Sequence, residues 1–207
     1  MSALSLKIAE IRCEMVRCQL HCKGIINNPR CLFLDPSDAE SVDCVIVGLN
    51  PGPIDSPEQE PTDGTACLNK HIKAPYYKNF RGFANKLGFK SILWTELCKC
   101  QKDKDQREIP IQTLRTCIHK YLEREIEAVE ADVPLIAAGD NAYRVLSYRY
   151  TYRSVIGVPH PTGSHGQWSD LIKNYIEKAK AAINSTKASE CVRVFPTDLR
   201  KKDQRRE

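Results

Sequence analysis

Residues 43–52, Asp-Cys-Val-Ile-Val-Gly-Leu-Asn-Pro-Gly, are a short apolar run that stops at turn residues. The length of the run and its β-branched side chains are typical of a buried strand, and the Asn-Pro-Gly ending predicts the turn that stops it. Cys44 lies inside the run, where we interpret its thiol as a small buried hydrophobe. The run therefore predicts a strand with a polar residue, Asn50, at its carboxyl end.

Strand and helix patterns alternate along the rest of the chain. Further strands are predicted at 91–97, 133–138 and 155–158. Helices are predicted at 5–23, 77–87, 110–129 and 168–183, with a short helix from Ala142. The proline-rich and acidic residues 51–74 are predicted to form a long loop. This alternation predicts an α/β fold with a mostly parallel sheet.

Length and composition predict one globular domain. The chain has 207 residues, of which 42% are hydrophobic and 28% charged, enough for a three-layer core. No apolar run approaches the roughly 20 residues of a membrane helix, and residues 1–15 lack an apolar signal core, so we expect a cytoplasmic protein without a membrane partner. We assign 1–190 to the domain and the basic residues 191–207 to a tail predicted to be flexible.

Polar residues follow three of the predicted strands. Asn50, Glu96 and His160 lie at or just after strand ends. In open α/β sheets, ligands bind at the carboxyl ends of strands, where the strand order reverses. Either Asn-Pro-Gly or His-Pro-Thr-Gly alone is explained as a good turn. Both together, at two separate strand ends, predict a binding site.

The same two segments resemble motifs of the uracil-DNA glycosylase superfamily. Gly48-Leu-Asn-Pro-Gly52 resembles the first motif, and its Asn is similar to that of the mismatch-specific and single-strand-selective branches. The latter also carry a proline next, as Pro53 does here. His160-Pro-Thr-Gly163 resembles the second motif, with Thr where Ser is usual, and Trp168 fits a tryptophan that follows it.

Residues between the two motifs resemble the iron–sulfur, or family 4, branch. The segment Thr95-Glu-Leu-Cys-Lys-Cys100 is followed, after a gap of 16 residues, by Cys117 and then by Tyr121-Leu-Glu-Arg-Glu-Ile126. The resemblance implies a three-layer α/β/α sandwich with a central four-stranded parallel sheet. That agrees with the four strands predicted from the pattern alone.

Ten cysteines are a high number for a chain without an export signal, and they favour metal or cluster ligands over disulfides. The resemblance implies a 4Fe-4S cluster held by four thiolates, with Cys100 and Cys117 at family positions. The family's N-terminal Cys-x-x-Cys pair is absent. Cys18 and Cys22 are four residues apart and would share one face of the predicted helix, so we assign them as the other two ligands. Cys13 or Cys31 is the alternative to one of them, and zinc is the alternative to the cluster.

The resemblance also implies roles in cleaving the bond between a base and its sugar. Asn50 and His160 are the expected catalytic residues: Asn50 orients water, and a neutral His160 donates a hydrogen bond to the base. Tyr76, or else Tyr77, is expected to stack on the extruded base, with ordinary core packing as the alternative. The expected base pocket contains Gly48, Leu49, Pro51, Gly52, Tyr76, Tyr77, Glu96, Pro161 and Thr162. The expected wedge that enters the duplex contains Ser164, His165 and Gln167.

Glu96 is the largest departure from the family pattern, which has an asparagine that reads the edge of uracil. An ionised carboxylate only accepts hydrogen bonds, so it favours a base with an exocyclic amino group. A protonated Glu96 in a dry pocket both donates and accepts, as asparagine does. The sequence therefore predicts the class of bond cleaved more sharply than the base released.

These features predict a monofunctional DNA glycosylase that excises a deaminated or damaged base, uracil first, in base-excision repair. We expect a monomer that binds damaged DNA and associates with the nucleoid through it. The net charge of +5 is mildly basic and by itself does not indicate nucleic-acid binding. The alternatives are a damage-binding protein without excision activity, a glycosylase for another base, and a zinc-stabilised nucleic-acid module. A redox protein is disfavoured, because the chain has neither Cys-x-x-Cys nor a glycine-rich dinucleotide fingerprint.

Overall fold

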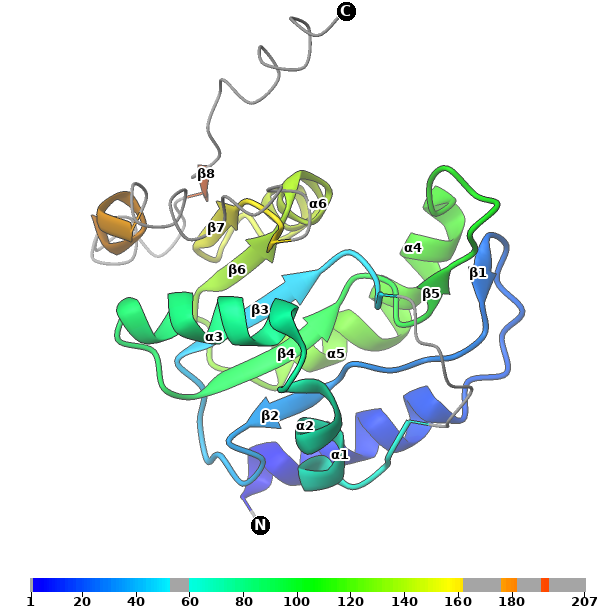
Figure 1. Ribbon diagram of the computed structural model, residues 1–207, viewed down its shortest axis with the longest axis horizontal. Helices are drawn as coiled ribbons and strands as arrows, with labels where there is room; N and C mark the ends of the chain where they lie inside the picture. Colours follow the sequence, from blue (N-terminus) through cyan, green and yellow to red (C-terminus); the bar gives the residue numbers. More distant parts are fainter. Residues whose placement is uncertain (1, 53–59, 162–175, 182–190, 194–207) are drawn as a thin grey trace, which may run out of the picture.

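A twisted sheet forms the middle layer of the protein in the computed structural model, which describes residues 2–52, 60–161, 176–181 and 191–193. The six strands run in the order β2-β4-β3-β6-β7-β8 (Figure 1). β2 is antiparallel to β4, and the other neighbouring pairs are parallel. The strands are β2 (Phe33–Asp35), β3 (Cys44–Gly48), β4 (Ile92–Glu96), β6 (Leu135–Ala138), β7 (Val155–Val158) and β8 (Cys191–Arg193).

Helices connect these strands. They are α1 (Ala3–Val16), α2 (Gly64–His71), α3 (Pro75–Lys86), α4 (Ile111–Cys117), the π-helix η1 (Ile118–Leu122), α5 (Glu123–Glu127), α6 (Asp140–Arg149) and a helical segment at 176–181. Two short strands, β1 (Ile25–Ile26) and β5 (Gln101–Lys102), pair antiparallel outside the main sheet. Among the residues that the structure describes, no helix combines the length and the apolar character of a membrane span.

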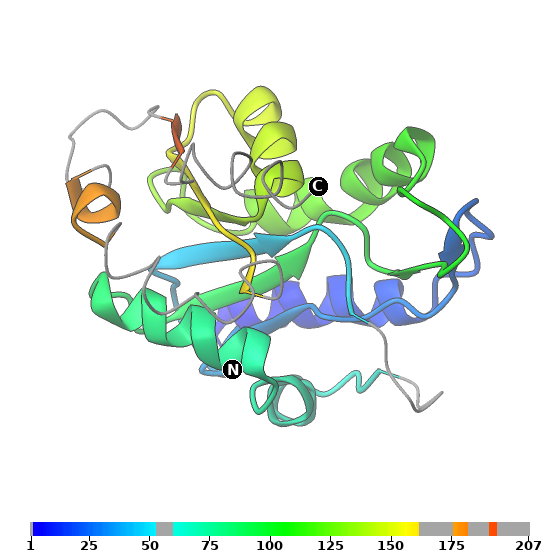
Figure 2. The same cartoon turned by 45° about the horizontal axis from the view of Figure 1, so that its top comes forward.

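Side chains of the central strands alternate between two apolar layers. On β3, Val45 and Val47 pack with α1, α5 and α6, whereas Cys44 and Ile46 pack with α2 and α3. Figures 1 and 2 show these two groups of helices on opposite sides of the sheet. The predicted α/β/α sandwich is confirmed, and the four predicted strands are its parallel centre. The sheet is wider than predicted, because β2 and β8 extend its two edges.

Two predicted elements are wrong in extent. The helix predicted at 5–23 ends at Val16, because its buried stripe stops there and the next large apolar residue, Leu20, is exposed. The loop predicted at 51–74 contains α2, whose N-cap Asp63 accepts a hydrogen bond from the backbone N–H of Ala66 at 2.7 Å. β8 lies within the range predicted as a tail.

The carboxyl ends of the parallel strands meet at one edge of the sheet. Gly48 and Glu96 end β3 and β4 as directly paired residues, and Ala138 and Val158 end β6 and β7 in the same way. The chain runs from β3 to β4 on one side and returns to β6 on the other, so the strand order reverses at β3. The edge next to this reversal is where open α/β sheets bind ligands.

A buried ion pair fixes the segment that leaves β4. The Lys99 Nζ donates to Glu125 Oε2 at 2.7 Å, to Thr95 Oγ1 at 2.5 Å and to the Glu96 carbonyl at 2.7 Å. Neither charged side chain is more than 1% exposed. The three bonds use all three ammonium protons, which a buried ammonium requires. The end of β4 is therefore attached to α5 across the layer interface.

We expect Glu125→Gln to lower the free energy of unfolding by about 3–5 kcal/mol, because it leaves the Lys99 ammonium buried without a countercharge. Urea unfolding measures this, with Glu127→Gln on the exposed face of α5 as the matched control. The double variant Lys99→Met with Glu125→Leu is expected to recover most of the loss. Equal midpoints for the two glutamine variants would contradict the role given to the pair.

Candidate active site

A cavity of about 450 Å³ lies at the carboxyl edge of the sheet, within the size range of small-molecule sites. Its walls contain Asn50 and Gly52 after β3, Glu96 at the end of β4 and His160 after β7. Tyr76 and Tyr77 reach it from the first turn of α3. The structure thus brings together six residues that the sequence predicts for one site, from four separate elements.

The other predicted site residues lie beside this cavity or outside the described residues. Gly48 ends β3 beneath Glu96, and Leu49 packs against the core. Pro51 and Pro161 are buried next to Asn50 and His160. Thr162 and the expected wedge residues Ser164, His165 and Gln167 lie outside the described residues.

His160 and Tyr76 form one side of the cavity. Their ring centroids are 5.2 Å apart, with planes tilted by 33°. Burial lowers the pKa of His160 below its usual 6.5, so the imidazole is neutral at pH 7. Gly139 lies directly behind: its φ is +93°, and an added Cβ would be 3.4 Å from the His160 Cβ. The positive φ favours a glycine at this position, and the 3.4 Å distance would be an ordinary contact.

Asn50 also lines the cavity. Its Nδ2 donates to the Pro51 carbonyl at 2.8 Å, which fixes the plane of the amide. A fixed amide can orient a water molecule, but it cannot remove a proton as a carboxylate would.

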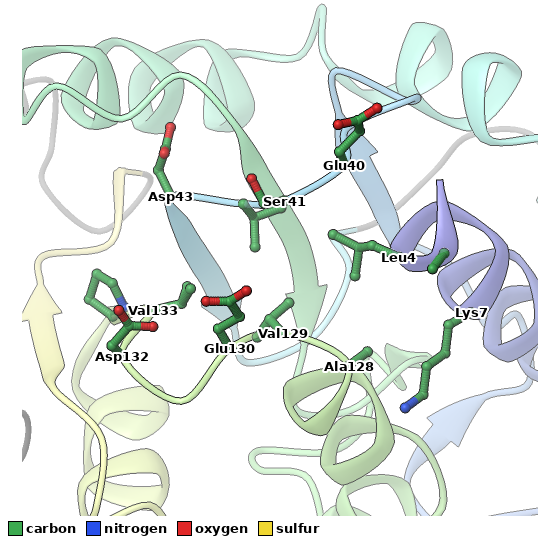
Figure 3. Close-up of a pocket in the computed structure, with 13 residues that line it drawn as sticks. Leu4, Lys7, Glu40, Ser41, Asp43, Ala128, Val129, Glu130, Asp132 and Val133 are labelled. Carbon is green, nitrogen blue, oxygen red and sulfur yellow. The ribbon is translucent and has the colours of Figure 1, made fainter. Parts of the chain in front are cut away.

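A second hollow lies at the opposite edge of the sheet, before β3 and β6 (Figure 3). Four of its lining residues are acidic, and Lys7 is the one cation among them. The acidic residues are Glu40, Asp43, Glu130 and Asp132. A surface of this charge repels phosphates, so the cavity at the carboxyl edge is the better candidate for nucleic acid.

Comparison with known proteins identifies the family. The sequence model of the uracil-DNA glycosylase superfamily matches residues 36–184. The chain belongs to this superfamily. Members of the uracil-DNA glycosylase superfamily are DNA glycosylases, and the matched range supplies every wall of the cavity except that formed by Arg30 and Cys31. No curated protein matches the chain significantly.

Glu96 is the one acidic side chain among the described residues that line this cavity. The side chain is buried in the cavity wall, and its Oε2 makes no hydrogen bond with the residues that the structure describes. Burial raises the pKa of Glu96 to about 8, although the positive charges of Lys99 and Arg30 lower it. At pH 7 the carboxyl group is therefore mostly protonated, and it can both donate and accept.

Arg30 is a cavity residue that the sequence did not indicate. It is 2% exposed, its Nη2 donates to the Gly52 carbonyl and to Gln101 Oε1, and its Nη1 makes no hydrogen bond with a described residue. Cys31, His71 and Ala74 were missed as well. These residues lie in segments without a strong motif, so only the folded chain shows that they reach the site.

The four cysteines predicted as ligands line another cavity, which is smaller than the one that contains Asn50, Glu96 and His160. Cys18 and Cys22 reach it from the irregular segment after α1, Cys100 from the segment after β4, and Cys117 from the end of α4. The prediction that Cys18 and Cys22 share a helix face is wrong, because α1 has already ended. The irregular backbone brings both to the same place instead.

The alternative ligands lie elsewhere. Cys31 is in the wall of the larger cavity, and Cys13 is on α1 and does not line the smaller one. Cys98, for which no role was predicted, is fully buried beside Cys117. The neighbouring Cys98 side chain lowers the pKa of Cys117, and the backbone N–H of Lys99 acts in the same direction.

We expect Gly48→Ala to be costly only while Glu96 is present, because an added Cβ would meet Glu96 Oε2 at 2.1 Å. The expected loss is about 1–3 kcal/mol in the wild type and much less beside Glu96→Ala. A double-mutant cycle measured by urea unfolding gives this coupling. Gly52→Ala is the control, since its Cβ would meet nothing within 4 Å. Additive effects would contradict the contact.

Proposed function

We propose that the chain is a monofunctional DNA glycosylase that hydrolyses the bond between a deaminated base and its deoxyribose in base-excision repair. The observation that carries the proposal is the convergence of Asn50, Glu96 and His160 on one cavity of suitable size. Family membership supports the reaction class. The proposed substrate is DNA, acted on by a monomer at the nucleoid.

The reaction needs the target base to leave the helix and enter the cavity. As the bond between C1′ and the base nitrogen breaks, its electron pair stays on the base and positive charge develops on the sugar. His160, neutral at pH 7, donates a hydrogen bond to a base oxygen that gains negative charge. Asn50 orients the water whose oxygen bonds to C1′ and whose proton passes to solvent. Tyr76 provides a face for the base to stack on.

Glu96 sets the edge of the base that the pocket accepts. Its protonated form offers one donor and one acceptor, which matches the O4 and N3–H of uracil. Its ionised form only accepts, and favours a base with an exocyclic amino group. The raised pKa supports uracil as the substrate near pH 7. A glycosylase for another base is the second candidate, and the ionised form of Glu96 favours it at higher pH.

We expect the purified chain to leave alkali-labile abasic sites in oligonucleotides that contain uracil. Asn50→Ala and His160→Ala are each expected to slow cleavage by about 10²-fold or more, because each removes a fixed polar group at the reacting bond. Single-turnover rates on a panel with uracil, hypoxanthine and xanthine measure this. Asn85→Ala and His119→Ala, both outside the cavity, are the matched controls. DNA binding without abasic product on any member would indicate a damage-binding protein instead.

We expect excision of uracil to decline as the pH rises through about 8, the pKa of Glu96, because the carboxylate then repels O4. Glu96→Gln should keep its rate, since the amide donates at every pH. The folded state also holds a proton that the unfolded state releases above 4.5, so stability falls between 4.5 and about 8. Glu96→Gln should remove this fall in thermal unfolding from about pH 5 to about pH 9. Parallel pH profiles of the two proteins would contradict a protonated Glu96.

The donor set of the smaller cavity fits a 4Fe-4S cluster, and we propose Cys18, Cys22, Cys100 and Cys117 as its ligands. Ligand atoms of one zinc ion lie close together, but no three of these thiols are mutually within 4.8 Å. A 4Fe-4S cluster places its four thiolate ligands farther apart than a zinc ion does, because each thiolate binds a different iron atom. When bound, the cluster would supply a rigid link between the segment after α1, the segment after β4 and α4.

We expect the anaerobically purified protein to be brown and to contain iron and acid-labile sulfide in equal amounts. Cys117→Ser should lose both and unfold at a lower temperature, because cluster binding contributes to folding. Cys44→Ser, which alters a buried thiol on β3 away from the cavity, should keep its iron. A colourless wild type that holds zinc instead would overturn the cluster.

A further inference from the structure

A second group of side chains that could bind a metal lies in and behind the wall of the cavity that contains Glu96, which we call the base cavity. Cys31 precedes β2, Glu60 precedes α2, and His71 ends α2, and all three are buried. In the part of the chain that the structure describes, this is the one group of three or more Cys, His, Asp or Glu whose ligand atoms all lie within 4.8 Å of one another. The distance from His71 Nε2 to Glu60 Oε1 is 2.6 Å, and that from His71 Nε2 to Cys31 Sγ is 4.0 Å.

These distances are close to those of a zinc site. Bonds of about 2.3 Å to sulfur and about 2.0–2.2 Å to nitrogen and oxygen place tetrahedral ligand atoms roughly 3.3–3.6 Å apart. A small opening between His71 and Glu60, and a small closure toward Cys31, would therefore fit the ion. Cys67 lies next to the group, with its Sγ 3.1 Å from Glu60 Oε1, but it is outside the set whose ligand atoms all lie within 4.8 Å, so its side chain would have to turn toward the ion to become a fourth ligand. Thiolate, imidazole and carboxylate are all ligands that zinc takes in proteins.

The charge around the group suits a bound ion. Zn²⁺ with the Glu60 carboxylate, two thiolates and a neutral His71 has a net charge of −1. Lys70 Nζ lies 3.6 Å from Glu60 Oε2, and this ammonium offsets that charge. The Arg12 guanidinium, which donates to the Leu32 and Thr62 carbonyls, lies near Cys67 and adds positive charge on the same side.

The ligands are held in place without the ion. Cys31 has φ +68°, an uncommon conformation for a residue other than glycine, and its N–H donates to Glu60 Oε1 at 3.1 Å. The His71 ring stacks on Phe33, with centroids 5.5 Å apart and planes within 9°. Ligands fixed by their surroundings lose little freedom when a metal binds.

We propose that Cys31, Glu60 and His71 bind a zinc ion that is separate from the four-cysteine group, and that Cys67 turns toward the ion as the fourth ligand. Cys31 and His71 also line the base cavity, so the ion would fix that wall. The site binds its ion whether or not the protein excises bases.

Metal content tests the proposal. The full-length protein, its Cys31→Ala and His71→Gln variants and the control Cys44→Ala are incubated with zinc, desalted, and analysed for zinc and iron. Cys44 is a buried thiol of the same apolar cluster but is not a ligand. We expect one zinc per chain in the wild type and the control, at least a tenfold loss in both ligand variants, and the same iron in all four. Equal zinc in all four proteins, or no zinc in any of them, would overturn the site.

A measurement on the wild type alone covers the case in which a ligand variant does not fold. Alkylation of Cys31 and Cys67 is followed by mass spectrometry in partly denaturing urea, with and without added zinc. We expect zinc to slow alkylation of both by at least tenfold and to leave Cys44 unchanged. Rates for Cys31 and Cys67 that do not respond to zinc would overturn the proposal even if total zinc content were high.

Discussion

The ammonium group of Lys99 is the point on which both cavities depend. Its three hydrogen bonds hold the end of β4 against α5, and the same residue's backbone carbonyl accepts from the Arg30 N–H at 2.9 Å. Glu96 lies on one side of this junction and Cys100 on the other. A charge that would be costly alone in the core is tolerable here because its partners are complete. The position of the Glu96 carboxyl and that of the cysteine group are therefore set by one buried contact.

A buried acid in the base cavity gives the proposed reaction a property that asparagine would not. An amide offers the same donor and acceptor at every pH, whereas Glu96 exchanges one pattern for another as it loses its proton. Desolvation is the dominant cause of its raised pKa, opposed by Lys99 and Arg30. A base entering the cavity displaces water and adds its own dipoles. Substrate binding and protonation of Glu96 are thus thermodynamically linked.

The sequence predicted those elements whose secondary structure is determined by their own residues. β3, β4, β6 and β7 are continuous apolar runs ended by turns, and the polar residues at their ends could be assigned to one edge. β2 was missed, because three residues carry no periodic signal, and α2 was missed within a polar segment. Arg30, Cys31 and His71 reach the cavity from such segments, where tertiary contacts decide the backbone. The four cysteines predicted as ligands do line one cavity, but for a different local reason than predicted, since spacing along a chain does not reveal where a helix ends.

Gly48 and Glu96 are paired residues on neighbouring strands, and the space that one leaves is filled by the other. Substitutions at these two positions are therefore expected to occur in a fixed order. A side chain at 48 is accommodated only after the carboxyl at 96 has been shortened or lost, whereas a change at 96 needs no prior step. With Glu96 as the proposed base-selecting residue, a change of base preference within this protein's lineage would begin at position 96 and continue at position 48. Sequences with a side chain at 48 but a glutamate at 96 should be rare.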